Sequence, residues 1–467
     1  MNKELHKQQD IVEPDNSSLT RPKLDQDVLG PSPSDVGTVY YSESARRPDG
    51  ENDVKSSLSM RSMNTTTQDE YRRQEAGRLY NVLNEAYFLP TDDDEFTRLN
   101  KQHLAVVIAL SSLYTAPQVV ETILAKREGE QQKILDVGCG TGVWTVAMAK
   151  AFPHCEVVGI DLAPVPLESE AIPPNCRFEL DDVNNSLTHY HDLFSVVHAR
   201  FIGAGLRDHK KCKEEIERCL KPGGIVLWMD GDYDMCTKER DVYSVPASDA
   251  HPDGSWFTRI LFETSRATLQ MGVSDLFAMS SMLSLGLWDD PLLDPETCGA
   301  GDLFTPIGPW ATDPNPLQNQ RLSHVGTLIR QDLSNGHRAL HAPLRKVGIS
   351  AETCNEWSEL ADKGIALNSP SAILHLNVHE EMNEMKKPLF LRFACAWGRR
   401  RAAPGKPAPP LPPVSPSTER EDDLPSSLPP YPFFDLFESK EQAKESYERR
   451  NKSKTYTPPP NPPGLQA

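Results

Sequence analysis

The nine residues 134–142, with the sequence ILDVGCGTG, constrain this chain more than any other stretch. Apolar residues around Asp136 are typical of a buried parallel strand, and three glycines directly after them indicate a tight turn. Glycine tolerates backbone angles that other residues resist, and it lets a ligand lie directly on the backbone. The apolar segment 143–150 then predicts a helix. A strand, a glycine turn and a helix in this order form a nucleotide-binding crevice.

The spacing of the glycines argues against a dinucleotide fingerprint, G-x-G-x-x-G, because Val143 follows Gly142 and the third glycine comes one position early. The pattern D-x-G-x-G-x-G instead resembles motif I of the class I methyltransferases that use S-adenosylmethionine (SAM). This resemblance implies that Gly138, Gly140 and Gly142 pack beneath the methionine and ribose portions of SAM. It also implies that Asp136 faces the amino end of the cofactor. The alternatives are an ordinary tight turn and a nicotinamide site.

Acidic residues end the next two predicted strands. The strand 157–161 ends at Asp161, about 20 residues after the glycine turn, where a carboxylate is well placed to accept hydrogen bonds from both ribose hydroxyls. The strand 176–182 ends at an acid pair. In the methyltransferase family an acid at this place hydrogen-bonds the adenine amino group, and Asp182 fits that role best, with Asp181 as the second choice. The alternative for either acid is a solvated strand end.

Two more strands, 194–201 and 225–230, complete the pattern, with a polar helix over 210–220 and a Lys-Pro-Gly-Gly turn between them. Five strands alternating with helices over about 100 residues predict an α/β fold with a doubly wound parallel sheet. The helical segment 96–113 precedes the first strand and is expected to lie across the crevice as a lid. There Arg98 or His103 would hold the cofactor carboxylate or shape the pocket; alternatively, Arg98 simply pairs with Glu95 on the surface.

Segments outside this core carry a narrower resemblance. They are Leu89-Pro90-x-Asp92 within 80–103, His198-Ala199-Arg200-Phe201 after strand four, the segment 306–310, and a closing strand at 391–399. With the core motifs they resemble the fungal LaeA-like methyltransferases, SAM-domain proteins tied to the control of secondary metabolism and development. The resemblance covers about residues 71–401. It implies a Rossmann-like sheet of seven strands whose last strand is antiparallel, with helical additions.

Composition divides the 467 residues into three parts. Residues 1–68 are polar and acidic with few aromatic residues, which predicts a disordered arm. The methyltransferase domain is expected over 69–402, with a core at 130–235 and a helical insertion at about 240–300. The tail 403–467 is predicted to be a disordered, Pro-rich segment with one charged helix over 439–451, because 16 of the 40 prolines fall after Arg401.

Charge and cysteine content exclude several classes of protein. A net charge of −18 argues against direct binding to nucleic acid, and the longest apolar run is too short to span a membrane. The nine cysteines form no C-x-x-C pair, which indicates a reducing compartment and no structural metal. We therefore expect a protein of the nucleus or cytoplasm. The basic cluster 399–401 is either a nuclear localisation signal or, as we favour, the solubilised end of a strand.

Methyl transfer mainly requires alignment of the acceptor with the methyl group, and a hydroxyl or protonated amine acceptor also needs a base. His198 lies at the end of strand four and is the first candidate; Arg200 lies beside it and His209 is the second histidine. The sequence thus predicts a SAM-dependent methyltransferase, LaeA-like, that influences fungal secondary metabolism or development. Its acceptor would be a small molecule or a protein, and regulatory proteins would bind the Pro-rich tail. The alternatives are an O- or N-methyltransferase tailoring one metabolite, and a SAM-binding scaffold with little turnover.

Overall fold

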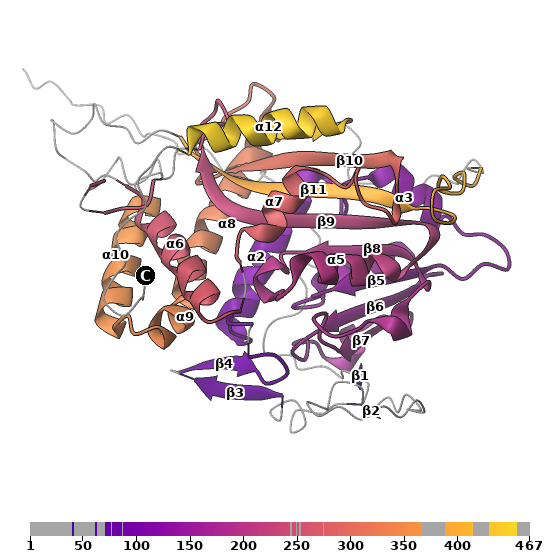
Figure 1. The fold of residues 1–467 in the computed structure, drawn as a ribbon, viewed down its shortest axis with the longest axis horizontal. Coiled ribbons are helices and arrows are strands. Elements are labelled where there is room, and N and C mark those ends of the chain that lie inside the picture. The colour runs from indigo at the N-terminus through magenta and orange to yellow at the C-terminus, as the bar shows by residue number, and fades with distance from the viewer. Residues whose placement is uncertain are drawn as a thin grey trace, which may run out of the picture.

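The computed structural model describes residues 40–41, 61–62, 71–75, 77–85, 87–242, 245–248, 250–251, 254–273, 275–366, 388–413 and 429–454. A sheet of eight strands runs through the molecule, in the order β12-β10-β11-β9-β8-β5-β6-β7 (Figure 1). The strands are β5 (Lys133–Val137), β6 (Glu156–Asp161), β7 (Cys176–Leu180), β8 (Phe194–Arg200), β9 (Leu220–Cys236), β10 (Leu293–Pro306), β11 (Phe390–Arg400) and β12 (Phe434–Phe437).

The first five strands, β5 to β9, are parallel and confirm the doubly wound sheet. Neighbouring residues of β5 are buried on opposite faces: Ile134 packs with α3 (Pro117–Leu124) and α4 (Val143–Ala151), and Leu135 packs with α5 (His209–Arg218). Helices on both faces explain why these strands are continuously apolar in sequence rather than alternating. The arrangement leaves the carboxyl ends of the parallel strands to form one edge of the sheet.

The antiparallel part of the sheet has one strand more than the sequence predicts. Strand β11 runs antiparallel to both β9 and β10, as the resemblance implies. The eighth strand, β12, pairs with β10 and comes from the tail, and α12 (Lys440–Ser453) follows it. The prediction of a disordered tail is therefore wrong for residues 429–454, although the predicted helix is present. Aromatic residues Tyr431 and Phe433 pack into the large apolar cluster, which supplies the missing burial.

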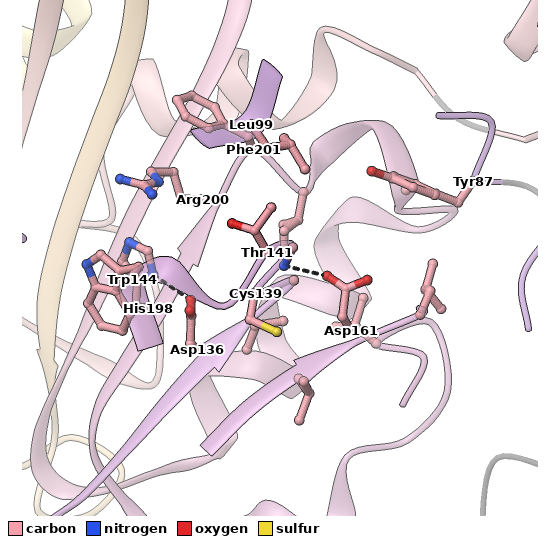
Figure 2. A pocket seen from close by; sticks show the side chains of 18 of the residues that line it. Tyr87, Leu99, Asp136, Cys139, Thr141, Trp144, Asp161, His198, Arg200 and Phe201 are labelled. Carbon is pink, nitrogen blue, oxygen red and sulfur yellow. Dashed lines mark hydrogen bonds and ion pairs between the residues drawn. The ribbon is translucent and has the colours of Figure 1, made fainter. Parts of the chain in front are cut away.

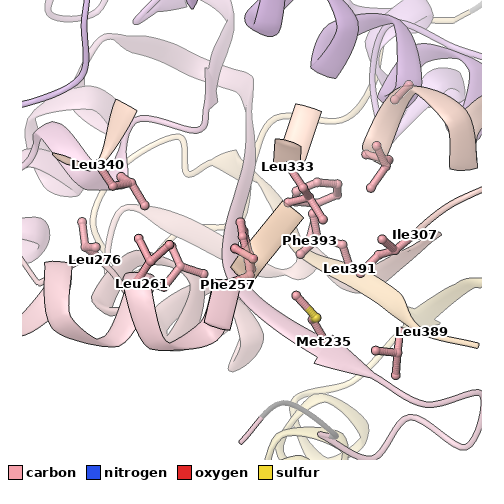
Figure 3. Packing of buried hydrophobic residues seen from close by; sticks show 14 of the residues in the cluster. Met235, Phe257, Leu261, Leu276, Ile307, Leu333, Leu340, Leu389, Leu391 and Phe393 are labelled. Carbon is pink, nitrogen blue, oxygen red and sulfur yellow. The ribbon is translucent and has the colours of Figure 1, made fainter. Parts of the chain in front are cut away.

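Further helices pack around strands β9–β11 or against one another. They are α2 (Asp93–Leu110), α6 (Trp256–Gln270), α7 (Ala278–Ser284), α8 (Pro316–Ala339), α9 (His341–Lys346) and α10 (Ala351–Ala366). Helix α2 packs against α8, and α6 packs against α9 and α10. The largest apolar cluster joins these helices, except α7, to β9–β11, with Phe257 and Leu333 near Leu391 and Phe393 (Figure 3). Helix α7 instead packs in the cluster that contains α5. The predicted helical insertion ends at Ser284, because β10 already begins at Leu293.

The expected disordered arm 1–68 lies outside the described residues, apart from the short paired strands β1 (Tyr40–Tyr41) and β2 (Arg61–Ser62). A second two-stranded sheet joins β3 (Arg72–Glu75) and β4 (Arg78–Asn81). All nine cysteines are free thiols. Within the described residues no helix is long and apolar enough to cross a bilayer, and no cluster of three His, Cys, Asp or Glu side chains could hold a metal ion.

Candidate functional site

The three glycines of the turn after β5 all adopt left-handed backbone angles, with φ of 67°, 57° and 76° at Gly138, Gly140 and Gly142. A Cβ at Gly138 would lie 2.4 Å from Ile202, and one at Gly142 would lie 2.7 Å from Phe178. A Cβ at Gly140 would meet only Leu99, at 3.4 Å. The first and third glycines are thus needed for packing, whereas the backbone at Gly140 faces open space.

That space is a cavity of about 120 Å³ at the carboxyl ends of β5, β6 and β8. Asp161 lies on its wall, where its carboxylate accepts hydrogen bonds from the backbone N–H of Gly140 at 2.7 Å and of Ala163 at 3.1 Å (Figure 2). Burial raises the pKa of Asp161 to about 6. Each carboxylate oxygen has a further lone pair, so Asp161 can still accept hydrogen bonds from a ligand.

The acid pair after β7 separates into two environments. Asp181 lines the cavity, and one of its oxygens lies 2.9 Å from Nε2 of His189. Asp182 is not among the residues that line the cavity, and its Oδ1 accepts hydrogen bonds from the backbone and side chain of Asn184 at 3.0 and 2.8 Å. The structure therefore does not favour Asp182 as the adenine contact, because only Asp181 of the pair lines the cavity. Asp181 takes its place as the candidate.

A polar network joins β5 to β8 on the opposite wall. Asp136 accepts a hydrogen bond from Thr145 at 2.6 Å, and its other oxygen lies 2.8 Å from Nδ1 of His198. The His198 ring stacks on Trp144 with a centroid separation of 3.8 Å (Figure 2). Burial lowers the pKa of His198, although Asp136 opposes the shift. A neutral His198 that donates from Nδ1 to Asp136 keeps Nε2 as a proton acceptor.

Helix α2 lies against the cavity, as predicted for the segment 96–113. Asp92 caps its first turn by accepting from the backbone of Glu95, and Thr141 of the glycine turn donates to Asn100 at 2.7 Å. His103 lines the cavity, and its Nδ1 accepts a hydrogen bond from Arg200 at 2.8 Å. Burial, followed by the charge of Arg200, holds the pKa of His103 well below its usual value. Both side chains are therefore part of the cavity wall.

Two other candidates lie elsewhere. Arg98 is buried in a triad with Glu95, at 2.7 and 3.0 Å, and Asp332, at 2.6 Å, so it neither lines this cavity nor forms a surface pair. His209, on α5, has its Nε2 3.0 Å from the Gly203 carbonyl and is not among the lining residues. The prediction that His209 acts in catalysis is wrong, because that histidine fixes a loop.

Sequence reasoning missed several polar or aromatic residues of the cavity wall. Among them are Tyr87, Gln102, Thr141, Trp144, Asn184 and Phe201. Tyr87 and Gln102 belong to the segment 80–103 that carried the narrower resemblance, and Thr141 is inside the glycine motif. Their positions in those motifs were the available signal. Their function was hidden because helical periodicity distinguishes a buried face from an exposed one but does not show what the buried face meets.

Comparison with known proteins agrees with this geometry. A family described as "Methyltransferase domain" matches residues 128–263. The chain is 32% identical over 56% of its length to the secondary metabolism regulator laeA of Coprinopsis cinerea, of which it covers 63%. It is 27% identical to methyltransferase pytC of Aspergillus terreus, over 56% of this chain and 71% of that protein. It is 24% identical to the protein-methionine methyltransferase laeA of Emericella nidulans, over 51% of this chain and 58% of that protein.

The strand order, the glycine turn and the matched domain define a class I methyltransferase domain, a class in which the methyl donor is SAM. The residues present fit that cofactor, since Gly140 leaves its backbone open and Asp161 and Asp181 line the same cavity at successive strand ends. Within the class, the chain is similar to LaeA-like proteins. It spans about 60% of the length of the first regulators that it matches.

Proposed function

We propose that this protein is a SAM-dependent methyltransferase that influences secondary metabolism or development in the manner of its LaeA-like relatives. The observation that carries the proposal is the hydrogen bond between Asp161 and the backbone of Gly140 inside the cavity. It brings a buried carboxylate against the exposed backbone of the glycine turn, where the ribose of SAM would lie. The names of the relatives, a secondary metabolism regulator and a protein-methionine methyltransferase, support both the chemistry and the regulatory role.

Some residues of the cavity would hold the cofactor, and others would orient the acceptor. SAM supplies a methyl group on a positively charged sulfur. Asp161 would accept hydrogen bonds from the ribose hydroxyls, and Asp181 would accept one from the adenine amino group. His198, oriented by Asp136, would take a proton from a hydroxyl or amine acceptor, because its lowered pKa keeps Nε2 unprotonated at neutral pH. Arg200 and His103 close the wall beside it.

The acceptor is proposed to be a small molecule or a protein, and the cell compartment to be the nucleus or cytoplasm. One relative is named as a protein-methionine methyltransferase, which favours a protein acceptor. A net charge of −18 opposes nonspecific binding to DNA, so any action on chromatin would pass through protein partners. The Pro-rich segments of the tail are the proposed contact for such partners.

A second candidate is an O- or N-methyltransferase that tailors one metabolite. The similarity to pytC, which is named a methyltransferase and not a regulator, favours it. Gene deletion followed by complementation separates the candidates. If the Gly140→Asp form restores the phenotype, the protein acts as a scaffold that needs no cofactor. Failure to rescue with many metabolites altered supports the regulator, whereas loss of a single methylated product supports the tailoring enzyme.

Cofactor binding is tested by titrating the protein with S-adenosylhomocysteine (SAH) in a calorimeter. Gly140→Asp should abolish binding, because its side chain would enter the open space above the turn. Gly272→Asp is the matched control: Gly272 also has a left-handed backbone, with φ of 67°, but is exposed and has no neighbour within 4 Å of a Cβ. Asp161→Ala should weaken binding by about tenfold to a hundredfold, the effect of losing a charge-assisted hydrogen bond. Equal binding by wild type and Gly140→Asp would refute the assignment.

A further inference from the structure

A second cavity, of about 70 Å³, adjoins the cofactor cavity. The two share Tyr87, Leu99, Gln102 and Phe201 on their walls, so a ligand in one lies against a ligand in the other. The second cavity lies between α2, α6 and α8, beyond the end of β8. Of the residues predicted from the sequence to bind the cofactor, Arg98 alone lines this second cavity.

Most of the wall of this cavity is aliphatic or aromatic. Phe257 and Leu261 of α6 and Leu276 face Leu333 and Leu340 from α8 and the turn after it (Figure 3). Such a surface binds apolar groups by removing them from water and offers nothing to replace the hydration of an ion. The volume is about half of a cavity that holds benzene, which limits the group to a few carbon atoms.

The charged groups at the wall are bonded to other groups of the protein. Arg98 donates to Glu95 and Asp332, both within the same buried triad. Asp230 accepts from the backbone N–H of Gly203 and of Gly231, each at 2.8 Å. An ionic ligand would have to break one of these arrangements. The cavity therefore favours an uncharged ligand.

Two residues at the boundary between the cavities point to a ligand there. Gln102 is 1% exposed, and its Nε2 has no hydrogen-bond partner among the described residues. A buried amide N–H without a partner is costly and is normally satisfied. Phe201 has a left-handed backbone with φ of 59°, which is rare for a bulky residue and is often retained at functional sites.

We infer that the second cavity holds the methyl acceptor, and that the acceptor presents a small, uncharged aliphatic group there. The amide of Gln102 donates to an uncharged oxygen or sulfur of that ligand at the boundary with the cofactor cavity. This inference rests on the proposed function, because it takes the first cavity as the site of SAM. It excludes carboxylates and ammonium groups as the part of the acceptor that enters.

Gly336 offers a way to fill the cavity without changing the cofactor site. It lies on α8 and lines the second cavity but not the first. A Cβ at Gly336 would lie 3.6 Å from the side chain of Arg98, an ordinary van der Waals distance. Gly336→Leu should therefore occupy the cavity, while Gly336→Ala is the matched control that leaves most of it open. Thermal unfolding of both variants checks that the fold is retained.

The probes are 3-methylbutan-1-ol, 3-methylbutylammonium and 3-methylbutanoate, which share one carbon skeleton and differ in charge. Saturation transfer from the SAH-bound full chain should be seen for the alcohol with wild type and Gly336→Ala, and lost with Gly336→Leu. Gln102→Leu should weaken binding of the alcohol about three- to tenfold. Binding of the ions as strong as that of the alcohol, or persistence of the alcohol signal in Gly336→Leu, would overturn the inference.

Calorimetry with SAH on the same samples distinguishes a failure of the acceptor inference from a failure of the cofactor assignment. If SAH binds wild type and Gly336→Leu alike but the alcohol fails to bind wild type, the acceptor inference is wrong and the cofactor assignment stands. If SAH does not bind wild type, both are wrong. Retained SAH binding with the alcohol lost only in Gly336→Leu supports both.

Discussion

Buried charged side chains have different surroundings in the parallel half of the sheet and in its antiparallel half. In the parallel half, Asp161 and His198 lie on the wall of a cavity, with hydrogen-bonding capacity left over. In the antiparallel half, Arg392 is 1% exposed and is enclosed by Asp232 and Asp302, with Arg450 of α12 on the far side of Asp302. In the parallel half these polar groups remain available to a ligand, whereas in the antiparallel half the charged groups pair with one another and hold the strands together.

The direction of the pKa shifts follows this division. Asp161 has a raised pKa because it is buried and no cation among the described residues pairs with it. Burial alone would lower the pKa of Arg392, but the carboxylates of Asp232 and Asp302 raise it. The carboxylate of Asp161 on the cavity wall is thus left to accept from a ligand, whereas Arg392 belongs to a structural network with Asp232 and Asp302.

The largest effect is expected at His198. With a hydroxyl or amine acceptor, both His198→Ala and His198→Asn should lower turnover by about 10²- to 10⁴-fold, the usual contribution of a general base. The amide N–H of His198→Asn can replace Nδ1–H as the donor to Asp136, so this variant should keep SAH affinity near that of wild type. Turnover is measured with saturating SAM and binding by calorimetry. If His198→Asn lost SAH affinity as well as turnover, His198 would have a structural role, and the two halves of the sheet would not differ in the way described.

A comparable effect, on stability and not on turnover, is expected at Arg392. Arg392→Met leaves Asp232 without its buried partner and should lower the free energy of unfolding by about 3–5 kcal/mol, measured in urea. Arg218→Met is the control, because Arg218 pairs with Glu214 on the surface, where such pairs contribute roughly 0–1 kcal/mol. SAH affinity of folded Arg392→Met should stay unchanged. Similar losses of stability in the two variants would show that the network is not structural.

The same division explains what could be predicted from the sequence. The parallel half follows from local signals, since glycines at 138, 140 and 142 fix one turn, Asp161 ends β6 and Asp181 directly follows β7. The antiparallel half depends on partners far apart: Asp302 meets Arg392 and Arg450, 90 and 148 residues away. Local composition favoured a disordered tail because prolines surround the short apolar run at 431–437. The pairing of that run with the edge of β10 is seen only in the structure.

The ordered part of the tail is expected to contribute moderately to stability. Deleting residues 429–467 exposes the edge of β10 and removes Arg450 from Asp302, a loss of about 1–3 kcal/mol, or several degrees in melting temperature. If the whole tail 403–467 were disordered, as its composition predicts, its removal would leave the melting temperature nearly unchanged. Deletion of residues 1–39 is the control, for which composition predicts little effect. Equal melting temperatures for all three proteins would show that β12 and α12 contribute no net stability.

The smallest expected effect is the pH dependence of cofactor binding, and it tests the availability of Asp161 directly. Above pH 6 the carboxylate is ionised and accepts hydrogen bonds from the ribose; below its pKa of about 6 it holds a proton that binding must displace. SAH affinity should therefore be constant from pH 7 to 8 and fall as the pH drops below 6, by up to about tenfold per unit. Asp161→Asn cannot titrate at this position and should bind more weakly at pH 7.5, with a flatter profile. If wild type and Asp161→Asn showed the same pH profile, another group would be titrating, and Asp161 would belong with the paired, structural charges of the other half.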